Sequence, residues 1–174
     1  MNLKYQKLNR TLFIGLVVVL NIAIDQISKV WVRASFAYGE TKSIIGDAFI
    51  MQYVENKGAF LGMGSDLNPT LRLVFLLVLP ILVLGYVAYY ILKHKELDKM
   101  SLIAFCCIIG GGIANVFDRI VLGSVTDFFY VDLGGVFRTG IFNIADMSVT
   151  AGMIMLLIAS FRSGKKKSLP AEDS

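Results

Sequence analysis

Long apolar stretches alternate with polar connections along this chain of 174 residues. Four of the stretches are long enough to cross about 30 Å of hydrocarbon as helices. They cover roughly residues 11–31, 69–92, 101–122 and 141–161. The pattern predicts an all-α polytopic membrane protein with four transmembrane helices in a single domain, residues 1–162. The polar residues 163–174 then form a disordered tail.

Two of the connections are long, and in a four-span chain both lie on the same face of the membrane. The first, residues 32–68, predicts two short strands around a Gly46-Asp47 turn, because it is rich in β-branched and aromatic residues. The second, residues 123–140, predicts a short hairpin with Gly134-Gly135 as the turn and Val136-Phe137 in the returning arm. We therefore expect a small β-sheet cradle at this end of the helices.

Basic residues mark the opposite ends of the helices. They precede the first span, fill the loop between the second and third spans, and follow the fourth span: Lys4, Lys7, Arg10, Lys93, Lys95, Lys99, Arg162, Lys165, Lys166 and Lys167. Such residues favour the cytoplasmic side, so both termini are expected to be cytoplasmic and the cradle to lie on the outer face. The formal net charge of +4 follows from this pattern and requires no nucleic-acid partner.

The first span resembles a signal peptide in following basic residues. It is too long for the apolar region of a signal peptide, and no small-x-small cleavage site follows it, so we interpret it as a retained anchor. Cys106 and Cys107 are neighbours on a helix and point apart, which argues against a disulfide between them. No set of His and Cys residues has zinc spacing, so we expect neither a metal nor a cofactor.

Polar residues within the spans gather at the outer end. They recur at intervals of three or four residues, which places them on one face of each helix: Asn21, Asp25 and Lys29; Gly111, Asn115 and Arg119; Asn143 and Asp146. Asn56 and Asp127 lie in the two outer connections. A carboxylate near hydrocarbon costs a few kcal/mol, so charged residues there usually serve a function. Their common depth indicates a site that faces outward, just inside the membrane surface.

Each of these residues also has a purely structural interpretation. Asp25 and Lys29 can form a structural ion pair, and the glycines at 110–112 can allow close helix packing. Asn115 and Asn143 can form hydrogen bonds between helices, and Asp118 and Arg119 can be interfacial charges. Structural polar residues would be scattered through the bilayer, however, and these are not.

The chemistry open to this cluster is limited. No His lies near it, which excludes a Ser-His or Cys-His nucleophile. Asp127 and Asp146, if the fold brings them together, can act as a general acid–base pair that shares one proton. One ionised carboxylate would take a proton from water while its protonated partner polarises a peptide carbonyl. This is the chemistry of an aspartic protease.

Three alternatives come from other classes. An ion-coupled transporter could use Asp25, Asp127 and Asp146 as a proton relay, but the cytoplasmic halves of the spans are almost purely apolar. A non-catalytic assembly partner has no evident use for a shared acid pair. A presenilin-type protease would carry a Gly-x-Gly-Asp motif, which is absent.

Five motifs follow one another along the chain. They are Asp25-Gln-Ile-Ser-Lys29, Asn56-Lys-Gly-Ala-Phe60, Gly111-Gly-Ile-Ala-Asn115-Val-Phe-Asp-Arg119, Gly123-Ser-Val-Thr-Asp127-Phe and Phe142-Asn143-Ile-Ala-Asp146. In this order and spacing the series resembles bacterial lipoprotein signal peptidase, also called signal peptidase II. The second motif departs from the family pattern, since Asn-x-Gly-Ala-Ala-Phe is one small residue longer.

The resemblance implies a monomeric, multi-pass aspartyl endopeptidase of the bacterial inner membrane with its active site at the outer interface. Its substrate would be a diacylglyceryl-modified prolipoprotein, cut just before the lipidated lipobox cysteine, with membrane lipid as the surrounding partner. Asp127 and Asp146 match the catalytic dyad. Other matched positions line the site and hold substrate or the dyad: Asn56, Gly111, Asn115, Arg119 and Asn143. Asp25 and Lys29 match a polar pair that we interpret as structural support.

Overall fold

The computed structural model describes residues 3–59 and 63–167. Within this part, four helical segments are long and apolar enough to cross a membrane, as the sequence predicted. They are α1 (Leu3–Ser35), the segment made of α2 (Pro69–Leu73), η2 (Val74–Val78) and α3 (Leu79–Lys93), α4 (Lys99–Leu122), and α5 (Ile144–Lys167). The chain is therefore a multi-pass membrane protein.

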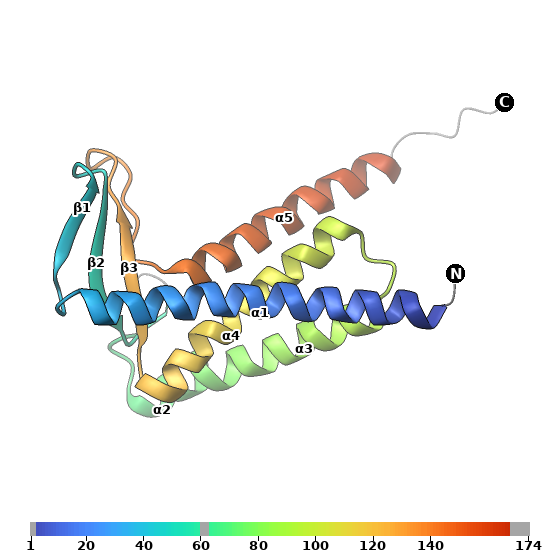
Figure 1. The fold of residues 1–174 in the computed structure, drawn as a ribbon, viewed down its shortest axis with the longest axis horizontal. Coiled ribbons are helices and arrows are strands. Elements are labelled where there is room, and N and C mark those ends of the chain that lie inside the picture. The colour runs from blue at the N-terminus through green and yellow to red at the C-terminus, as the bar shows by residue number, and fades with distance from the viewer. Residues whose placement is uncertain (1–2, 60–62, 168–174) are drawn as a thin grey trace.

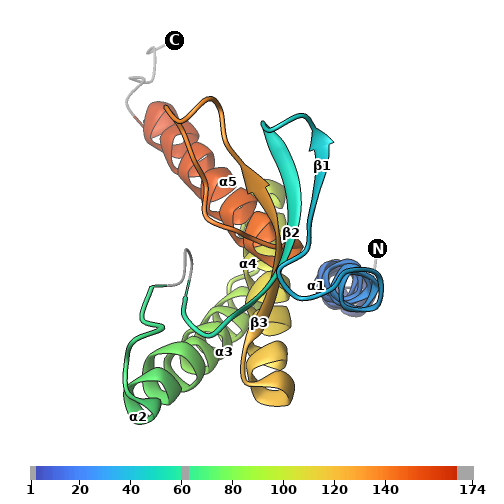
Figure 2. The same cartoon turned by 90° about the vertical axis from the view of Figure 1, so that its left-hand side faces the viewer.

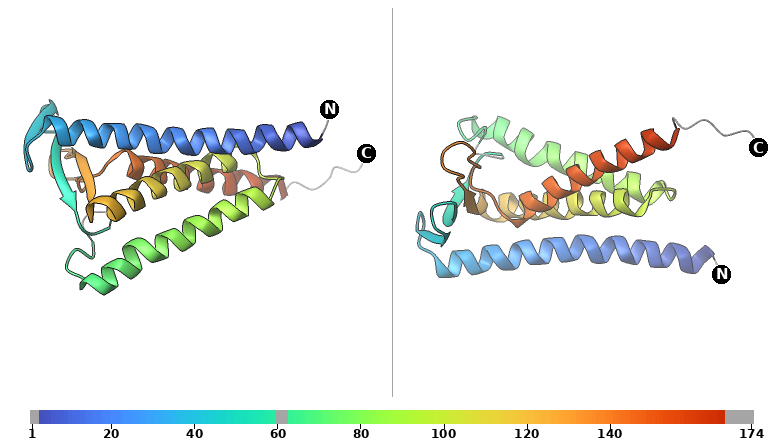
Figure 3. Two further views of the ribbon diagram at one scale, coloured as in Figure 1. Left: turned by 60° about the horizontal axis from the view of Figure 1, so that its bottom comes forward. Right: turned by 90° about the horizontal axis from the view of Figure 1, so that it is seen from above.

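The helices run lengthwise with a small sheet across one end, which we call the sheet end (Figure 1). Viewed from that end, α4 lies between the other three spans (Figure 2). Half of its apolar window is buried, whereas the second span buries none of its own. The start of α1, the α3–α4 connection and the end of α5 lie at the opposite end (Figures 1 and 3). The three segments rich in basic residues therefore share that end.

The sheet has three antiparallel strands in the order β1-β2-β3. They are β1 (Thr41–Ile45), β2 (Phe49–Asn56) and β3 (Val125–Val131). The two strands predicted around Gly46-Asp47 are present as β1 and β2, and Gly46 adopts a positive φ of 50° between them. Because β3 pairs with β2, the register places Asp127 opposite Val54 and Val125 opposite Asn56.

The hairpin expected after β3 is only partly formed. Gly134 and Gly135 make the turn with φ values of 67° and 81°, but Val136-Phe137 form no strand, and Val136 is 95% exposed. The returning chain instead forms two isolated bridges, one from Phe142 to Phe129 in β3 and one from Arg138 to Asp132, directly after β3. The bridge from Arg138 is reinforced by its ion pair with Asp132 at 2.9 Å. The returning chain is irregular because it leaves the sheet to reach the start of α5.

Asparagine side chains define two of the helix starts. Asn68 accepts a hydrogen bond from the backbone N–H of Leu71, and Pro69 occupies the first turn of α2, so the second span begins where the sequence predicted. The fourth span begins at Ile144 rather than at the expected position 141, because Asn143 caps it. A disordered tail was expected at residues 163–174, but α5 continues to Lys167. Residues 168–174 lie outside the described residues, and so does Phe60 of the second motif.

Two apolar clusters hold the bundle. The cluster away from the sheet joins α1, α3 and α4 through Ile14, Ile91, Leu102, Cys106 and Ile109. The cluster at the sheet end joins α1 to β2 and β3 through Val32, Phe36, Met51 and Phe128. Polar side chains are buried between the two clusters, at the level where the helices meet the sheet.

Candidate active site

Asp127 is buried within β3. The first four residues of this strand are all buried, since β3 contacts α1 and α4 and pairs with β2. The Asp127 side chain is 2% exposed. Its two carboxylate oxygens accept hydrogen bonds from Nδ2 of Asn56 at 2.9 Å and from Nδ2 of Asn143 at 2.7 Å. Both amides therefore hold this carboxylate in one orientation.

Asp146 lies in the first turn of α5 and takes part in the capping of that helix. Oδ1 of Asn143 accepts a hydrogen bond from the Asp146 backbone N–H at 2.9 Å, and Oδ2 of Asp146 accepts one from the Asn143 backbone N–H at 3.2 Å. This reciprocal pair is a capping box, and it places a carboxylate at the positive end of the helix dipole. Asn115 on α4 donates its Nδ2 to the other oxygen of Asp146 at 2.8 Å.

Two amide side chains bring the aspartates together. The Nδ2 group of Asn143 reaches Asp127 and also Oδ1 of Asn115 at 3.1 Å, while Asn115 donates to Asp146. The chain of contacts thus runs from Asp127 through Asn143 and Asn115 to Asp146. Residues from β3, α4 and the start of α5, far apart in the sequence, form one site at the sheet end.

Burial, and next the charge of Asp146, raise the pKa of Asp127 from 3.8 to about 7. The hydrogen bonds from Asn56 and Asn143 act in the opposite direction, because they stabilise the ionised form. Asp127 can therefore carry a proton near neutral pH. This property is needed in a pair of carboxylates of which one must donate and the other accept a proton.

The raised pKa of Asp127 gives a pH prediction. The neutral carboxyl is present below about pH 7 and is lost above it, so hydrolysis should slow as the pH rises through 7. In Asn56→Ala the pKa of Asp127 should rise further, because a donor to the ionised form is removed. The falling limb of a kcat/KM–pH profile should then move to higher pH, with Gln52→Ala on the same strand as the control. An unmoved limb in Asn56→Ala would contradict this assignment.

Cavities open on both sides of the pair. Asn115, Arg119 and Asp146 line a cavity of about 470 Å³ between η2, α3, α4 and α5, whose other walls include Leu76, Val149 and Met153. Asn56 and Asp127 line a second cavity of about 520 Å³ between β2 and the chain that precedes α5. Asp146 therefore lines a groove among the spans, and Asp127 lines a separate pocket beside β2.

The sequence model of the family described as "Signal peptidase (SPase) II" matches residues 17–162. The chain belongs to the signal peptidase II family. A lipoprotein signal peptidase of Streptococcus pyogenes serotype M1 is 35% identical to it over 155 residues, which cover 89% of this chain and 96% of the relative. The protein of the same name from serotype M2, strain MGAS10270, is 34% identical over the same share of each chain.

Two solved structures have the same fold as this signal peptidase II family member. Both are described as a bacterial membrane enzyme solved by the in meso method, one at 2.3 Å and one at 1.9 Å resolution. The first has a TM-score of 0.80 and 25% identity, and the match covers 92% of this chain and 94% of that one. The second has a TM-score of 0.73 and 27% identity, with 84% and 91% covered.

The other residues expected at the site lie around the pair. Arg119 donates to the carbonyl of Gly58 at 2.8 Å and so fastens the loop that follows Asn56. Gly111 packs against α5, because a side chain at this position would meet the Ala145 backbone carbonyl next to Asp146. Among the described residues, no group of three His, Cys, Asp or Glu side chains is placed to hold a metal ion. Independence from metal stays a prediction.

The structural interpretation of Asp118 as an interfacial charge is wrong. It is 1% exposed and forms an ion pair with Lys29 at 2.8 Å, while Lys29 also pairs with Asp25 at 2.7 Å. Lys29 in turn donates to Oδ1 of Asn115 at 2.9 Å, which links the three charges to the aspartate pair. Asp25 accepts from the Ala145 backbone N–H at 2.8 Å and thereby holds the start of α5.

A second polar network was missed in the sequence. Glu55 accepts hydrogen bonds from the hydroxyls of Ser124 at 2.6 Å and Thr126 at 2.9 Å, and Arg33 donates to the Thr126 hydroxyl at 2.8 Å. These contacts fix the start of β3, just before Asp127, against β2 and α1. The sequence offered one indication of this network, since Glu55 directly precedes Asn56 and Thr126 directly precedes Asp127.

Proposed function

We propose that this member of the signal peptidase II family is an aspartyl endopeptidase that removes the signal peptide from diacylglyceryl-modified prolipoproteins. It cuts the peptide bond just before the lipidated lipobox cysteine, and Asp127 and Asp146 are its catalytic dyad. The observation that carries the proposal is the amide-bridged pair of carboxylates at the sheet end of a four-span bundle. The Streptococcus pyogenes relatives named lipoprotein signal peptidase support the substrate class.

The geometry supports a two-carboxylate mechanism. Asp127, with a pKa of about 7, holds the shared proton and donates it to the oxygen of the scissile carbonyl. Asp146 takes a proton from a water molecule as the water oxygen bonds to the carbonyl carbon. The resulting tetrahedral intermediate collapses when a proton passes to the peptide nitrogen and the C–N bond breaks. Asn56, Asn115 and Asn143 keep the two carboxylates oriented throughout.

The basic segments support one orientation in the membrane. The end of α5, the α3–α4 connection and the start of α1 lie together at the end opposite the sheet, and Arg10, Lys93 and Lys99 belong to these segments. By the positive-inside rule this end is cytoplasmic in the bacterial inner membrane, and the active site faces outward. One chain supplies every residue of the site, which supports a monomeric enzyme.

The structure does not support the alternative of an ion-coupled transporter. A proton relay needs polar groups through the depth of the membrane, but the bundle between the site and the opposite end is filled by the apolar cluster of Ile14, Ile91 and Leu102. Among the described residues of the spans, the buried charged side chains Asp25, Lys29 and Asp118 lie in the halves nearer the sheet (Figure 1).

The proposed function is tested with purified protein and a diacylglyceryl prolipoprotein, followed by release of the signal peptide on a gel. We expect cleavage of the lipidated precursor and at least about a hundredfold slower cleavage of the same precursor without lipid. The reason is that the groove reaching Asp146 opens among membrane spans, where a lipid-anchored substrate is concentrated. Equal turnover of the two precursors would contradict the substrate class, and no turnover of either would contradict the activity.

A further inference from the structure

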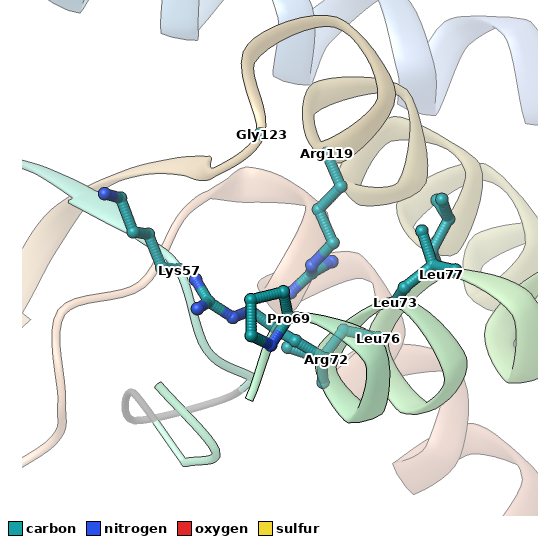
Figure 4. Close-up of a pocket in the computed structure, with 8 residues that line it drawn as sticks. All are labelled: Lys57, Pro69, Arg72, Leu73, Leu76, Leu77, Arg119 and Gly123. Atoms are coloured by element: carbon teal, nitrogen blue, oxygen red, sulfur yellow. The ribbon is translucent and has the colours of Figure 1, made fainter. Parts of the chain in front are cut away.

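A third cavity lies beside the active site and is lined by cationic side chains. It has a volume of about 280 Å³ and lies between α2, η2 and the end of α4. Arg72 and Arg119 form its polar wall together with the chain at Lys57, and Leu73, Leu76 and Leu77 form its apolar wall (Figure 4). The Arg119 side chain extends from α4 toward Pro69, and the Arg72 side chain passes Pro69 and ends beside the chain at Lys57, whereas the Lys57 ammonium points away (Figure 4).

The terminal nitrogens of both arginines have acceptors: Arg72 donates to the Leu67 carbonyl at 3.5 Å, and Arg119 donates to the carbonyls of Asn115 at 3.2 Å and Gly58 at 2.8 Å. Each arginine nevertheless keeps one buried donor without an acceptor. Within the part of the chain that the structure describes, only two buried side-chain nitrogen or oxygen atoms have no hydrogen-bond partner, namely Nε of Arg72 and Nε of Arg119. Both belong to residues that line this one cavity. Buried polar groups are normally paired, so two orphaned donors at one place indicate that an acceptor is missing.

The nearby acids do not supply that acceptor. Among the described residues, no carboxylate forms an ion pair with Lys57, Arg72 or Arg119. Asp118 is held by Lys29, and the catalytic pair is held by asparagine amides. Asp66, in the loop before α2, is exposed. Two guanidinium groups that line one cavity at the end of two spans therefore lack a counter-ion.

We propose that this cavity binds the phosphodiester of an anionic membrane phospholipid. Guanidinium forks match phosphate oxygens in charge and in bidentate geometry. The cavity lies where the second span begins at Pro69 and where α4 ends before Gly123, which is the depth of a lipid headgroup. The leucine wall continues along the second span and offers the acyl chains an apolar surface. A free phosphate ion would match the arginines but would leave this surface unused.

The bound lipid would also reach the active site through Arg119. This residue lines both the cationic cavity and the groove that contains Asp146, and it holds the Gly58 carbonyl in the loop after Asn56. A phosphate on Arg119 would fix the guanidinium in this position. The lipid site is nevertheless independent of the proposed catalytic reaction, because its binding can be measured without turnover.

The test is lipid binding by the delipidated full-length protein in neutral detergent, measured by native mass spectrometry. Phosphatidylglycerol, phosphatidylcholine and inorganic phosphate are titrated separately. We expect one phosphatidylglycerol to bind to the wild type at least about tenfold more tightly than to Arg72→Gln, since a charged hydrogen-bonding partner is lost. Arg138→Gln is the matched control, because Arg138 lies at the same end but is exposed and pairs with Asp132. Its affinity should equal that of the wild type.

Specific outcomes would overturn the proposal. Equal phosphatidylglycerol affinity in wild type and Arg72→Gln would remove Arg72 from the site. Equal binding of phosphatidylcholine, or of inorganic phosphate, would show that the site does not select an anionic lipid. If Arg72→Gln does not fold, Arg72→Lys provides the test, because it keeps the charge and loses the fork. A loss of affinity of about threefold or more is expected, and an unchanged affinity contradicts the geometry.

Discussion

Replacing Asp127 or Asp146 by Asn is expected to stop signal-peptide release, lowering kcat/KM by at least about a thousandfold while the protein still folds. Asn nearly matches the shape of Asp but cannot exchange a proton, so the general acid or the general base of the pair is lost. Both oxygens of each carboxylate accept hydrogen bonds from N–H donors, so an Asn of the same size fits the space but loses one of these hydrogen bonds. The measurement is a time course of cleavage of the lipidated precursor by each purified variant.

The control for this prediction is Asp132→Asn. Asp132 also lies at the sheet end, directly after β3, but it pairs with Arg138 and takes no part in the amide-bridged cluster. Its cleavage rate should match that of the wild type. Thermal melting in detergent confirms that the inactive variants are folded. Cleavage by either Asn variant within about tenfold of wild type, a loss of only ~1.4 kcal/mol, would show that the dyad assignment is wrong.

The spans and the polar faces of the helices could be predicted because local spacing determines them. Apolar length gives the number of spans, and intervals of four residues place Asp25 and Lys29 on one face of α1, where they do form an ion pair. The residues Asn115, Asn143 and Asp146 were placed at one depth by counting along the helices. The structure brings these three side chains into direct contact.

Other contacts could not be predicted because they join elements through tertiary packing. The spacing of α4 puts Asp118 next to Arg119 and says nothing about Lys29 on another helix, although the three-charge cluster depends on that contact. The register of β3 against β2 decides that Asn56 reaches Asp127. The start of α5 moved to Ile144 because a capping side chain, and not hydrophobicity, ends the preceding loop.

The buried charges are expected to make Lys29 the residue whose loss costs most stability. Lys29 is fully buried and pairs with both Asp25 and Asp118, so Lys29→Ala leaves two carboxylates without their cation. Breaking a buried pair in this way typically costs about 3–5 kcal/mol. Asp25→Ala should lower the free energy of unfolding less through its lost charge, because Lys29 still pairs with Asp118. It also removes the acceptor for the Ala145 N–H at the start of α5.

The double variant separates these contributions. Asp25→Ala combined with Lys29→Ala leaves one unpaired carboxylate instead of two, so its loss should be smaller than the sum of the single losses by about 0.5–3 kcal/mol. Thermal and denaturant unfolding in detergent measure all three variants, and Arg138→Ala, which breaks an exposed pair, should cost at most about 1 kcal/mol. Strict additivity would mean that Asp25 and Lys29 do not meet. Singles that melt like wild type yet lose all turnover would place the pair in the catalytic machinery and not in its support.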